Sequence, residues 1–436
     1  MRQFIYLLIS CLCLTIVNAV SSKQSSEKEY ALILYDPELI PLNSTDISLL
    51  SPEIQTFVNY LKENYDLTIA DYNDEEVELF YQDYLRFDQL ILLPSSKKGI
   101  KNKSNLNQES LTKFINEGGN IFAVGGSSST LPDGIRSFLN EIGIYPSPKN
   151  YKFIDHFNSK NNKIQLNEET NLIPGNKIIN NLKTAEYNDG NTVLISNNDL
   201  IQPILKSSKT GYTNKIGESI HGETTWTFGE QGYLAVGFQA LNNARLVWIG
   251  SIDLLNDESL YKWCFQETGV IKLDFVQHSN DNEPTKLNPH LYRIKDNAIY
   301  TIGMSELVDG EWVPYKVENT EDNLQMSFKM LDPYQRLNLL PMGPVSSKEN
   351  STTLDSFAYY VNFTIPDHHG MFTFELDYKR NGLSYILDKK VVTVRHLAND
   401  EFKRSWDISN SWLYIASTAL VIISWIIFVV SYVYIV

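Results

Sequence analysis

The sequence predicts a multidomain protein: an amino-terminal α/β domain with an open sheet, then an antiparallel β-sandwich, then one C-terminal transmembrane helix. Three patterns predict this order. Continuous apolar runs alternate with helical patterns in the first third, apolar residues recur at every second position after residue 323, and the segment 412–436 contains no charged side chain. Continuous apolar strands covered by helices are typical of parallel sheets, whereas strict alternation is typical of strands buried on one face.

The chain begins with a secretory signal pattern. Arg2 precedes an apolar run at Phe4–Val17, and Ala19 ends a small-residue cleavage pattern. We therefore expect residues 1–19 to be a signal peptide, so that the mature chain starts near Val20.

Residues 20–150 are predicted to form the α/β domain. Apolar runs typical of buried strands occur at Tyr30–Tyr35, Phe87–Leu93 and Ile121–Val124. Apolar residues at helical spacing lie between them, namely Ile54, Phe57, Val58 and Leu61, and then Leu111, Phe114 and Ile115. Strands separated by amphipathic helices predict a parallel sheet covered on both faces.

Residues 151–276 are interpreted as a second α/β lobe. Short strands are expected at Thr192–Ser196, Tyr233–Phe238 and Arg245–Gly250, followed by a helix around Ser259–Glu267. The pattern leaves open whether this lobe shares a sheet with the first.

A polar segment at residues 277–289 is the clearest linker, because it combines Asn, Asp and Glu with two prolines. Residues 290–398 then follow a period of two and predict the β-sandwich. Its alternating positions are Leu324, Met326, Phe328 and Met330, then Tyr359, Val361, Phe363 and Ile365, then Phe372, Phe374, Leu376 and Tyr378. A juxtamembrane segment at 399–411 leads to the transmembrane helix at 412–436, which is long enough to span a hydrocarbon core of about 30 Å.

Charge and cysteine content exclude several classes of protein. The formal net charge is −15, which argues against nucleic acid or anionic lipid as the main partner. Cys264 is the one cysteine outside the expected signal peptide, so a disulfide framework and a zinc cluster of cysteines are excluded. We expect Cys264 to be a small buried hydrophobic residue.

The most enzyme-like pattern is the turn Gly125–Ser129, directly after an expected strand. A nucleophile elbow places a serine at such a turn, here Ser127, but the Gly-x-Ser-x-Gly motif lacks its last glycine. We favour a tight polar turn and keep a membrane-anchored lumenal serine hydrolase using Ser127 as the alternative. His221, His368 and His369 lack metal-ligand spacing, so the sequence predicts no catalytic, cofactor-binding or metal-ligating residue.

The orientation across the membrane depends on two opposing signals. Lys403 and Arg404 precede the terminal helix, and by the positive-inside rule alone they place the body in the cytosol. The signal peptide commits the body to translocation and outweighs them, which predicts a lumenal body. Four Asn-x-Ser/Thr sequons agree with this orientation and are candidate N-glycosylation sites: Asn43, Asn102, Asn350 and Asn362.

Small hydroxyl residues recur at every seventh position of the terminal helix, at Ser417, Ser424 and Ser431. Such a stripe lets another helix approach closely inside the bilayer. We interpret it as a helix-packing surface, with a plain anchor as the alternative.

Several longer segments resemble one family. They are Gly237–Arg245 continuing through Gly250–Asp253, Asp309–Tyr315, Leu331–Tyr334, Ile365–Phe372 and Asp377–Arg380. In these segments the chain resembles the family of the 48 kDa, or wheat-germ-agglutinin-binding, subunit of the eukaryotic oligosaccharyltransferase. The resemblance extends along most of the mature chain and is more specific than any short catalytic motif above.

The resemblance implies a single-pass type I protein of the endoplasmic reticulum membrane, within the complex that transfers an oligosaccharide from dolichyl diphosphate to Asn in Asn-x-Ser/Thr. It implies a non-catalytic scaffold with no cofactor, held with ribophorin II-like and defender-against-death-like subunits and a separate catalytic polytopic subunit. It also implies a flavodoxin-like or amidotransferase-like first domain without the nucleophile. Family members often end in a lysine-bearing cytosolic tail, whereas this chain ends at Val436. Retention then has to come from assembly, or the sequence is truncated.

Overall fold

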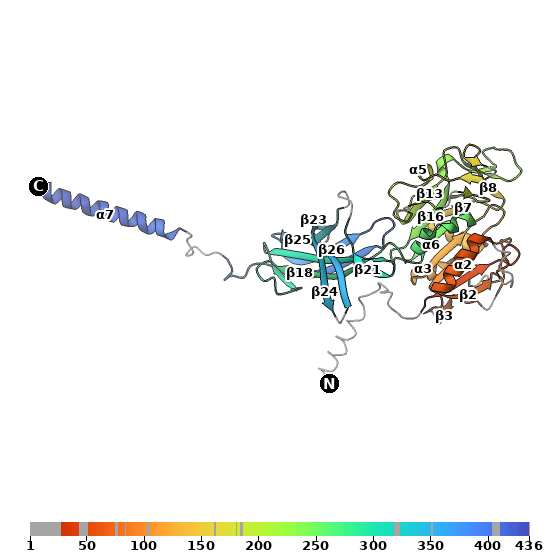
Figure 1. Ribbon diagram of the computed structural model, residues 1–436. Coiled ribbons are helices and arrows are strands. Elements are labelled where there is room, and N and C mark those ends of the chain that lie inside the picture. The colour runs from red at the N-terminus through yellow and green to blue at the C-terminus, as the bar shows by residue number, and fades with distance from the viewer. Residues whose placement is uncertain are drawn as a thin grey trace, which may run out of the picture.

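The computed structural model describes residues 28–42, 51–74, 77–82, 84–102, 105–160, 163–179, 181–183, 186–317, 323–349, 352–402 and 410–435. An α/β domain, a β-sandwich and a single long helix follow one another along the chain (Figure 1). The fold class predicted from the sequence is therefore confirmed.

A parallel sheet forms the centre of the α/β domain. Its strands lie in the order β2-β1-β5-β6-β17, and every neighbouring pair among them is parallel. These strands are continuous apolar runs because helices cover both faces of the sheet. Their bounds are β1 (Tyr30–Tyr35), β2 (Asp66–Asp71), β5 (Gln89–Leu92), β6 (Asn120–Val124) and β17 (Arg245–Ile249).

Helices cover the two faces of this sheet in separate groups. One core combines alternate residues of β1, such as Ile33, with α2 (Pro52–Asn64), the 3-10 helix η3 (Ile252–Asn256) and α6 (Glu258–Cys264). The other core combines the intervening residues of β1 with α3 and α4. Asn107 caps α3 by accepting a hydrogen bond from the Ser110 backbone N–H, and Gly143 ends α4 in the left-handed conformation. The bounds are α3 (Gln108–Asn116) and α4 (Asp133–Ile142).

The second lobe extends the same sheet. Beyond β17 the order continues β16-β12-β7, β13 pairs with β16, and all of these pairs are antiparallel. The sequence had left this sharing open, and the structure joins strands from the two predicted regions in one nine-stranded sheet. The bounds are β7 (Ile144–Pro146), β12 (Val193–Ile195), β13 (Ile201–Lys206) and β16 (Tyr233–Gln239).

Three small sheets and two short helices decorate the α/β domain. The sheet orders are β15-β14-β8, β11-β10-β9 and β3-β4. The strands are β3 (Phe80–Tyr81), β4 (Tyr84–Leu85), β8 (Tyr151–Ile154), β9 (Ser159–Lys160), β10 (Lys163–Gln165), β11 (Glu186–Tyr187), β14 (Tyr212–Lys215) and β15 (Thr225–Phe228), and the helices are α5 (Glu168–Asn171) and η2 (Gly229–Gln231).

The sandwich packs two five-stranded sheets around an aromatic core. The first sheet has the order β18-β20-β25-β24 with β21 beside β20, and the second has the order β19-β27-β26-β22-β23. Phe328 and Phe372 stack with their ring centroids 4.7 Å apart, as expected for the inward positions of alternating strands. The bounds are β18 (Val270–Asn280), β19 (Leu291–Arg293), β20 (Asn297–Val308), β21 (Glu311–Pro314), β22 (Gln325–Lys329), β23 (Pro333–Asn338), β24 (Leu340–Glu349), β25 (Thr352–Thr364), β26 (Gly370–Tyr378) and β27 (Ile386–Arg395).

Three details of this domain go beyond the sequence patterns. The expected linker at 277–289 begins inside β18, because residues 277–280 pair with β20 and turns follow only afterwards. The short strand β19 pairs with β27 in parallel, whereas the other strand pairs of the sandwich are antiparallel. Met330 is partly exposed because β22 has already ended at Lys329.

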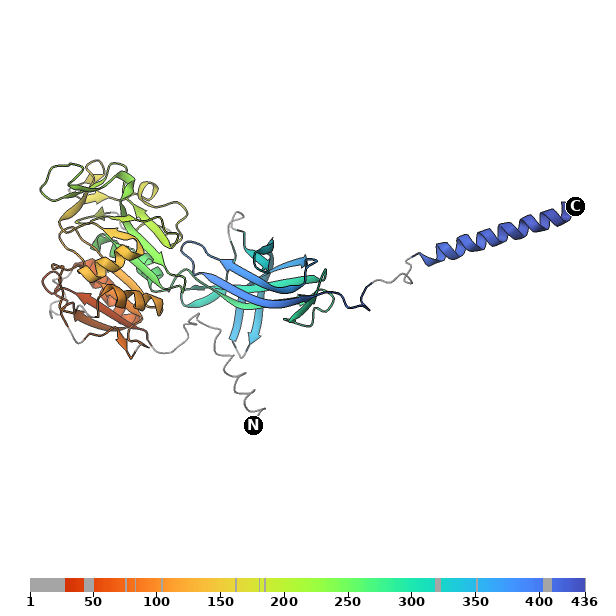
Figure 2. The same ribbon diagram turned by 180° about the vertical axis from the view of Figure 1, so that it is seen from behind.

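Helix α7 (Ser411–Ile435) lies apart from both domains in two opposite views (Figures 1 and 2). It is long and apolar enough to cross a membrane, and none of its apolar window is buried against the rest of the chain. Ser417 and Ser424 donate their hydroxyl protons to carbonyls of the preceding turn, those of Tyr414 and Leu420. This bonding lets a hydroxyl reside in an apolar helix.

Candidate functional site

The carboxyl edge of the parallel sheet is where an open α/β fold places a ligand site. Counted along the chain, the order β2-β1-β5-β6-β17 reverses direction between β1 and β5. Open α/β sheets bind ligands beyond the carboxyl ends of their strands, at such a reversal. The segments that follow β1, β5, β6 and β17 therefore make up the candidate edge.

At the reversal itself, the carboxylate of Asp36 is already bound. It accepts hydrogen bonds from the Ser96 backbone N–H (2.8 Å), the Ser96 hydroxyl (2.6 Å) and the Ser95 hydroxyl (3.2 Å), and from the backbone N–H of Glu38 (3.0 Å). Burial by itself favours the protonated form, but these hydrogen bonds outweigh it and hold the pKa of Asp36 below its usual value. Donors that could bind an anion are thus satisfied by the chain itself.

Ser127 follows β6 at the same edge but is not arranged as a nucleophile. It is buried, its backbone N–H donates to the Asp189 carbonyl (2.8 Å), and its carbonyl accepts from the Asn150 N–H (3.0 Å). Among the described residues, no hydrogen bond joins its hydroxyl to a histidine or a carboxylate. An activated serine needs such a base, so the geometry gives the hydrolase hypothesis no support.

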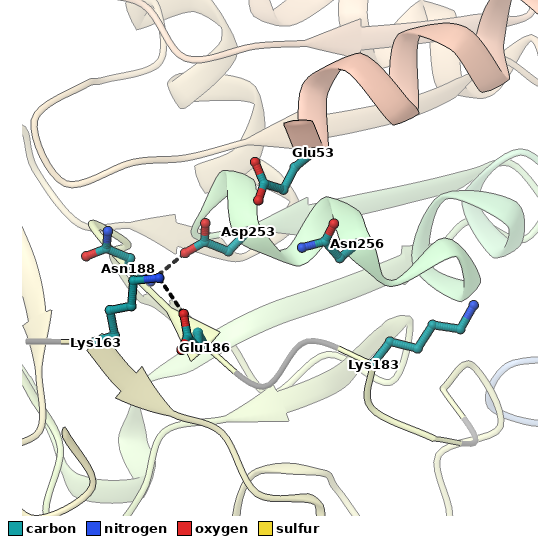
Figure 3. A pocket seen from close by; sticks show the side chains of 7 residues that line it. All are labelled: Glu53, Lys163, Lys183, Glu186, Asn188, Asp253 and Asn256. Carbon is teal, nitrogen blue, oxygen red and sulfur yellow. Dashed lines mark hydrogen bonds and ion pairs between the residues drawn. The ribbon is translucent and has the colours of Figure 1, made fainter. Parts of the chain in front are cut away.

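This edge carries a polar cleft of about 210 Å³ beside the β10–β11 pair (Figure 3). Lys163 pairs with Glu186, and the Asp253 carboxylate accepts from the Asn188 N–H at 2.6 Å. Burial raises the pKa of Asp253 above its usual value. The residues that line the cleft are Glu53, Lys163, Lys183, Glu186, Asn188, Asp253 and Asn256.

This cleft has no evident metal-binding geometry. Within the described ranges, no group of three His, Cys, Asp or Glu side chains is placed to hold a metal ion. Sequence reasoning missed the cleft because its residues come from four separated segments. The available signal was Asp253, which follows a buried strand at the carboxyl edge.

The opposite, amino edge of the sheet carries a denser polar cluster, where the sandwich inserts the turn between β26 and β27 into the α/β domain. Asn243 forms a reciprocal pair with Tyr385: its Nδ2 donates to the Tyr385 carbonyl (3.1 Å), and its Oδ1 accepts from the Tyr385 N–H (2.6 Å). Gln239 donates to the Leu383 carbonyl (3.0 Å), and Trp263 donates to the Gly382 carbonyl (2.9 Å). We call this set of contacts the domain junction.

Arg245 is the buried centre of the domain junction. Its guanidinium donates to the carbonyls of Trp263 (2.8 Å), Thr268 (2.7 Å) and Gly269 (2.7 Å), and it lies 4.7 Å from the centre of the Trp263 ring. Burial lowers the pKa of Arg245 to about 9. The arginine therefore holds together the chain segment that leads from α6 into β18.

Gly269 and Gly382 allow the two domains to approach this closely. A Cβ atom on Gly269 would lie 2.2 Å from the Gly382 carbonyl oxygen. Both glycines have positive φ, +66° and +83°, which other residues adopt only at a cost. Ser384 completes the contact, since its hydroxyl donates to the Ile271 carbonyl and accepts from the Ile271 N–H.

The remaining candidate residues lie far apart. Asn102 is buried, and its Nδ2 donates to the carbonyls of Asp74 (2.8 Å) and Val77 (3.0 Å). Asn362 is exposed on β25, while Asn43 and Asn350 lie outside the described residues, and Ser417, Ser424 and Ser431 lie along α7. Cys264 is fully buried, as expected, and burial raises the pKa of its thiol.

Comparison with known proteins decides the family. Residues 22–281 match the family described as OST48, N-terminal domain, and residues 277–436 match the OST48 middle domain. The chain belongs to the OST48 family. The resemblance inferred from the sequence is thereby confirmed.

Curated relatives in the OST48 family align over most of their length. The chain is 38% identical to the dolichyl-diphosphooligosaccharide–protein glycosyltransferase subunit WBP1 of Saccharomyces cerevisiae, over 97% of this chain and 94% of the relative. It is 30% identical to the subunit wbp1 of Schizosaccharomyces pombe, over 96% and 95% of the two chains. It is 28% identical to the 48 kDa subunit of Drosophila melanogaster, over 81% of each chain.

The segment Gly237–Arg245, one of those that carry the resemblance to the OST48 family, lies at the domain junction. Gln239, Asn243 and Arg245 all belong to it. The structural role of this segment was not predictable from the sequence, because the partners of Gln239 and Asn243 lie more than a hundred residues later in the chain. The available signal was an arginine at the start of an apolar strand.

Proposed function

We propose that this chain is a non-catalytic, scaffold-type subunit of an oligosaccharyltransferase complex. That complex transfers a preassembled oligosaccharide from dolichyl diphosphate to Asn of Asn-x-Ser/Thr in nascent proteins. The observation that carries the proposal is the 38% identity, over 97% of the chain, to a relative named as a subunit of this glycosyltransferase.

The geometry is consistent with a scaffold. Ser127 has no base among the described residues, and the donors at the strand reversal are satisfied by Asp36. The domain junction, by contrast, couples two domains through buried hydrogen bonds, each worth about 1 kcal/mol net. A rigid two-domain body on one membrane helix suits a protein that positions its neighbours.

The proposed partners are other subunits of the complex: ribophorin II-like, defender-against-death-like and catalytic polytopic subunits. The proposed location is the endoplasmic reticulum membrane, with the body in the lumen and α7 as the single type I anchor. In this arrangement the chain is needed for assembly and for full transferase activity.

Depletion of this chain in its own cells tests the proposal. We expect underglycosylation of a reporter with several sequons, together with loss of the partner subunits, and rescue of both by the intact chain. Purification in mild detergent should yield a multi-subunit glycosyltransferase particle. An isolated monomer with hydrolase activity, or normal glycosylation after depletion, contradicts the proposal.

Among the described sequons, we propose that Asn362 is glycosylated in the folded protein and that Asn102 is not. Asn362 is exposed, whereas Asn102 is buried and the amide nitrogen that would carry its glycan donates two hydrogen bonds to backbone carbonyls. Asn362→Gln should remove one glycosidase-sensitive mobility shift, and Asn102→Gln should leave the shift pattern unchanged. The reverse pattern contradicts this assignment.

The serine stripe of α7 is proposed as a packing surface for a partner helix. Replacing Ser417, Ser424 and Ser431 by Leu should release partner subunits while leaving the chain in the membrane. The matched control replaces Ala416, Ile423 and Val430, each one position earlier on the helix, by Leu. Unchanged co-purification of the partners with the triple serine variant leaves α7 as a plain anchor.

A further inference from the structure

The end of the sandwich from which the chain leaves toward α7 carries four exposed apolar side chains. Their exposed fractions are 53% for Leu291, 92% for Leu331, 65% for Met371 and 54% for Phe402. We call these four residues the exit end. Exposed apolar side chains gathered at one end of a domain indicate contact with another surface.

Strand register gathers the exit end. Leu291 and Met371 are both partners of Thr393, from opposite sides, so they flank it on the outer face of the second sheet. Leu331 lies in the turn between β22 and β23, and the neighbouring Met330 sulfur lies 3.2 Å from the Cβ position of Gly370, at the start of β26. Leu291, Met371 and Leu331 thus lie along one rim.

Polarity changes with distance from this rim. Along β26 and β27 away from the rim, the next pair on the outer face is Thr373 and the exposed Val391. The pair after that is Glu375 and Lys389, which form an ion pair that Lys329 also joins. At two residues per step, the outer face of β26 and β27 stays uncharged for roughly 7 Å from Met371 before this ion pair begins. This depth matches the 5–10 Å to which amphipathic surfaces enter the boundary between headgroups and acyl chains.

A clamp determines where the chain leaves the sandwich. Both terminal nitrogens of Arg395 donate to Glu401 at 2.8 Å, and Arg293 lies 3.2 Å from the same carboxylate. Hydrogen bonds from Arg395 and from the Ala398 backbone lower the pKa of Glu401 to about 2, so the clamp stays charged at neutral pH. Phe402, the next residue, is therefore held close to this clamp.

The distance from this clamp to the membrane anchor is short. Phe402 and Ser411, the first residue of α7, are nine residues apart, which limits their separation to about 31 Å when the chain is fully extended. The exit end is thus restrained near the bilayer that α7 crosses. No other apolar rim of the sandwich is covalently restrained in this way within the described residues.

We propose that the exit end docks on the bilayer that α7 crosses, with its four apolar side chains at the boundary between headgroups and acyl chains. Zwitterionic lipid suffices, because two of the cations nearby are paired with carboxylates: Arg395 with Glu401, and Lys295 with Asp367 at 2.7 Å. The body is then held at a defined height above the membrane by two contacts, the helix and the rim. This inference is independent of the transferase role.

The test places single environment-sensitive fluorophores on the full chain in phosphatidylcholine nanodiscs. Leu331→Cys and Met371→Cys report on the exit end. Val308→Cys is the matched control, because Val308 is 45% exposed and ends β20 at the other end of the sandwich. We expect headgroup spin-labelled lipid to quench the two exit-end labels severalfold more than the control, and iodide in the water to quench them less.

A second variant tests the lipid contact by adding a charge to the exit end. With the label moved to Leu291→Cys, the added change Leu331→Asp should reduce lipid quenching severalfold, because a carboxylate avoids the apolar boundary. All these positions are exposed, so folding is not at risk. Equal lipid quenching of exit-end and control labels overturns the proposal. Shielding from iodide that appears only when partner subunits are present, without lipid quenching, assigns the rim to a protein contact and also overturns it.

Discussion

The two edges of the parallel sheet use their polar residues in opposite ways. At the carboxyl edge, where open α/β sheets bind ligands, Asp36 is bound by its own domain and Ser127 is enclosed by neighbouring loops. At the amino edge, Gln239 and Asn243 bind the turn between β26 and β27 of the second domain. Arg245 binds the segment that leads to that domain. In this protein, a fold that often binds ligands uses the polar groups at its amino edge to join two domains.

This contrast makes the domain junction the region most sensitive to mutation. A buried donor or acceptor that loses its partner costs more than the bond itself contributed, because the orphaned group stays out of water. At the carboxyl edge, fewer buried donors and acceptors form hydrogen bonds to another domain. Mutations at the two edges should therefore differ in size and in what they disrupt.

Arg245→Leu should give the largest effect. It removes three hydrogen bonds: the Thr268 carbonyl loses its donor, while the carbonyls of Trp263 and Gly269 keep only the backbone N–H groups of Gln266 and Ser384. We expect a loss of about 3 kcal/mol or more in the free energy of unfolding. Urea titration of the detergent-solubilised chain measures it. Arg86→Leu, an exposed change, is the control and should shift the midpoint little. Equal urea midpoints for the two variants would contradict the stabilising role of Arg245 at the domain junction.

Gly269→Ala should have the next largest effect. The new Cβ would lie 2.2 Å from the Gly382 oxygen, so the domains must move apart, and we expect a loss of about 2 kcal/mol and faster proteolysis between the domains. Gly310→Ala is a matched control, because Gly310 also has positive φ (+83°) but nothing within 4 Å of its Cβ position. Its cost should be only the backbone strain, about 1 kcal/mol. Similar proteolysis of both variants would contradict a tight junction.

Asp36→Asn tests the carboxyl edge through pH. The folded pKa of Asp36 is below its unfolded value, so its carboxylate stabilises the fold above the ordinary Asp range, and this contribution is lost as pH falls through the folded pKa. We expect the variant to be about 1 kcal/mol less stable at neutral pH and to converge with the wild type in acid. Exposed Asp199→Asn is the control. A difference that is independent of pH would mean that Asp36 does not act through its charge.

Ser127→Ala should have the smallest effect. The Ser127 hydroxyl has no base among the described residues, so glycosylation of a reporter should be unchanged and stability should shift by about 0.5 kcal/mol or less. Ser96→Ala at the same edge is the comparison, because it removes a hydroxyl bond to Asp36 and should destabilise more. Loss of function in a folded Ser127→Ala protein would revive the hydrolase hypothesis and reverse the comparison between the edges.

Several elements were predictable because the spacing of their apolar residues indicates which of their faces is buried. Tyr30–Tyr35 is a continuous apolar run and forms a strand buried between two layers of helices, and Ile54, Phe57, Val58 and Leu61 form the buried face of α2. The alternation through Phe372, Phe374 and Leu376 reports one buried face of β26. In each case a local period of two or of about 3.6 residues is sufficient.

Other features were not predictable because they depend on residues far apart in sequence. The pairing of β17 with β6 unites two lobes across more than a hundred residues, and no periodicity encodes it. The parallel partner of β27 is a three-residue strand that begins inside the sandwich's first polar loop. The burial of Asn102 likewise depends on carbonyls about 25 residues earlier, so a sequon motif cannot reveal it.

The sequence by itself determined the fold class, the apolar terminal helix and the family, because periodicity, charge and long ordered segments are properties of the chain alone. Only the tertiary structure decided what the polar residues do. Arg245 could have been a surface charge, and Ser127 could have been a nucleophile, until their neighbours were known. The physical reason is that the state of a polar group depends on which partners and how much water surround it, and both are brought by distant parts of the chain.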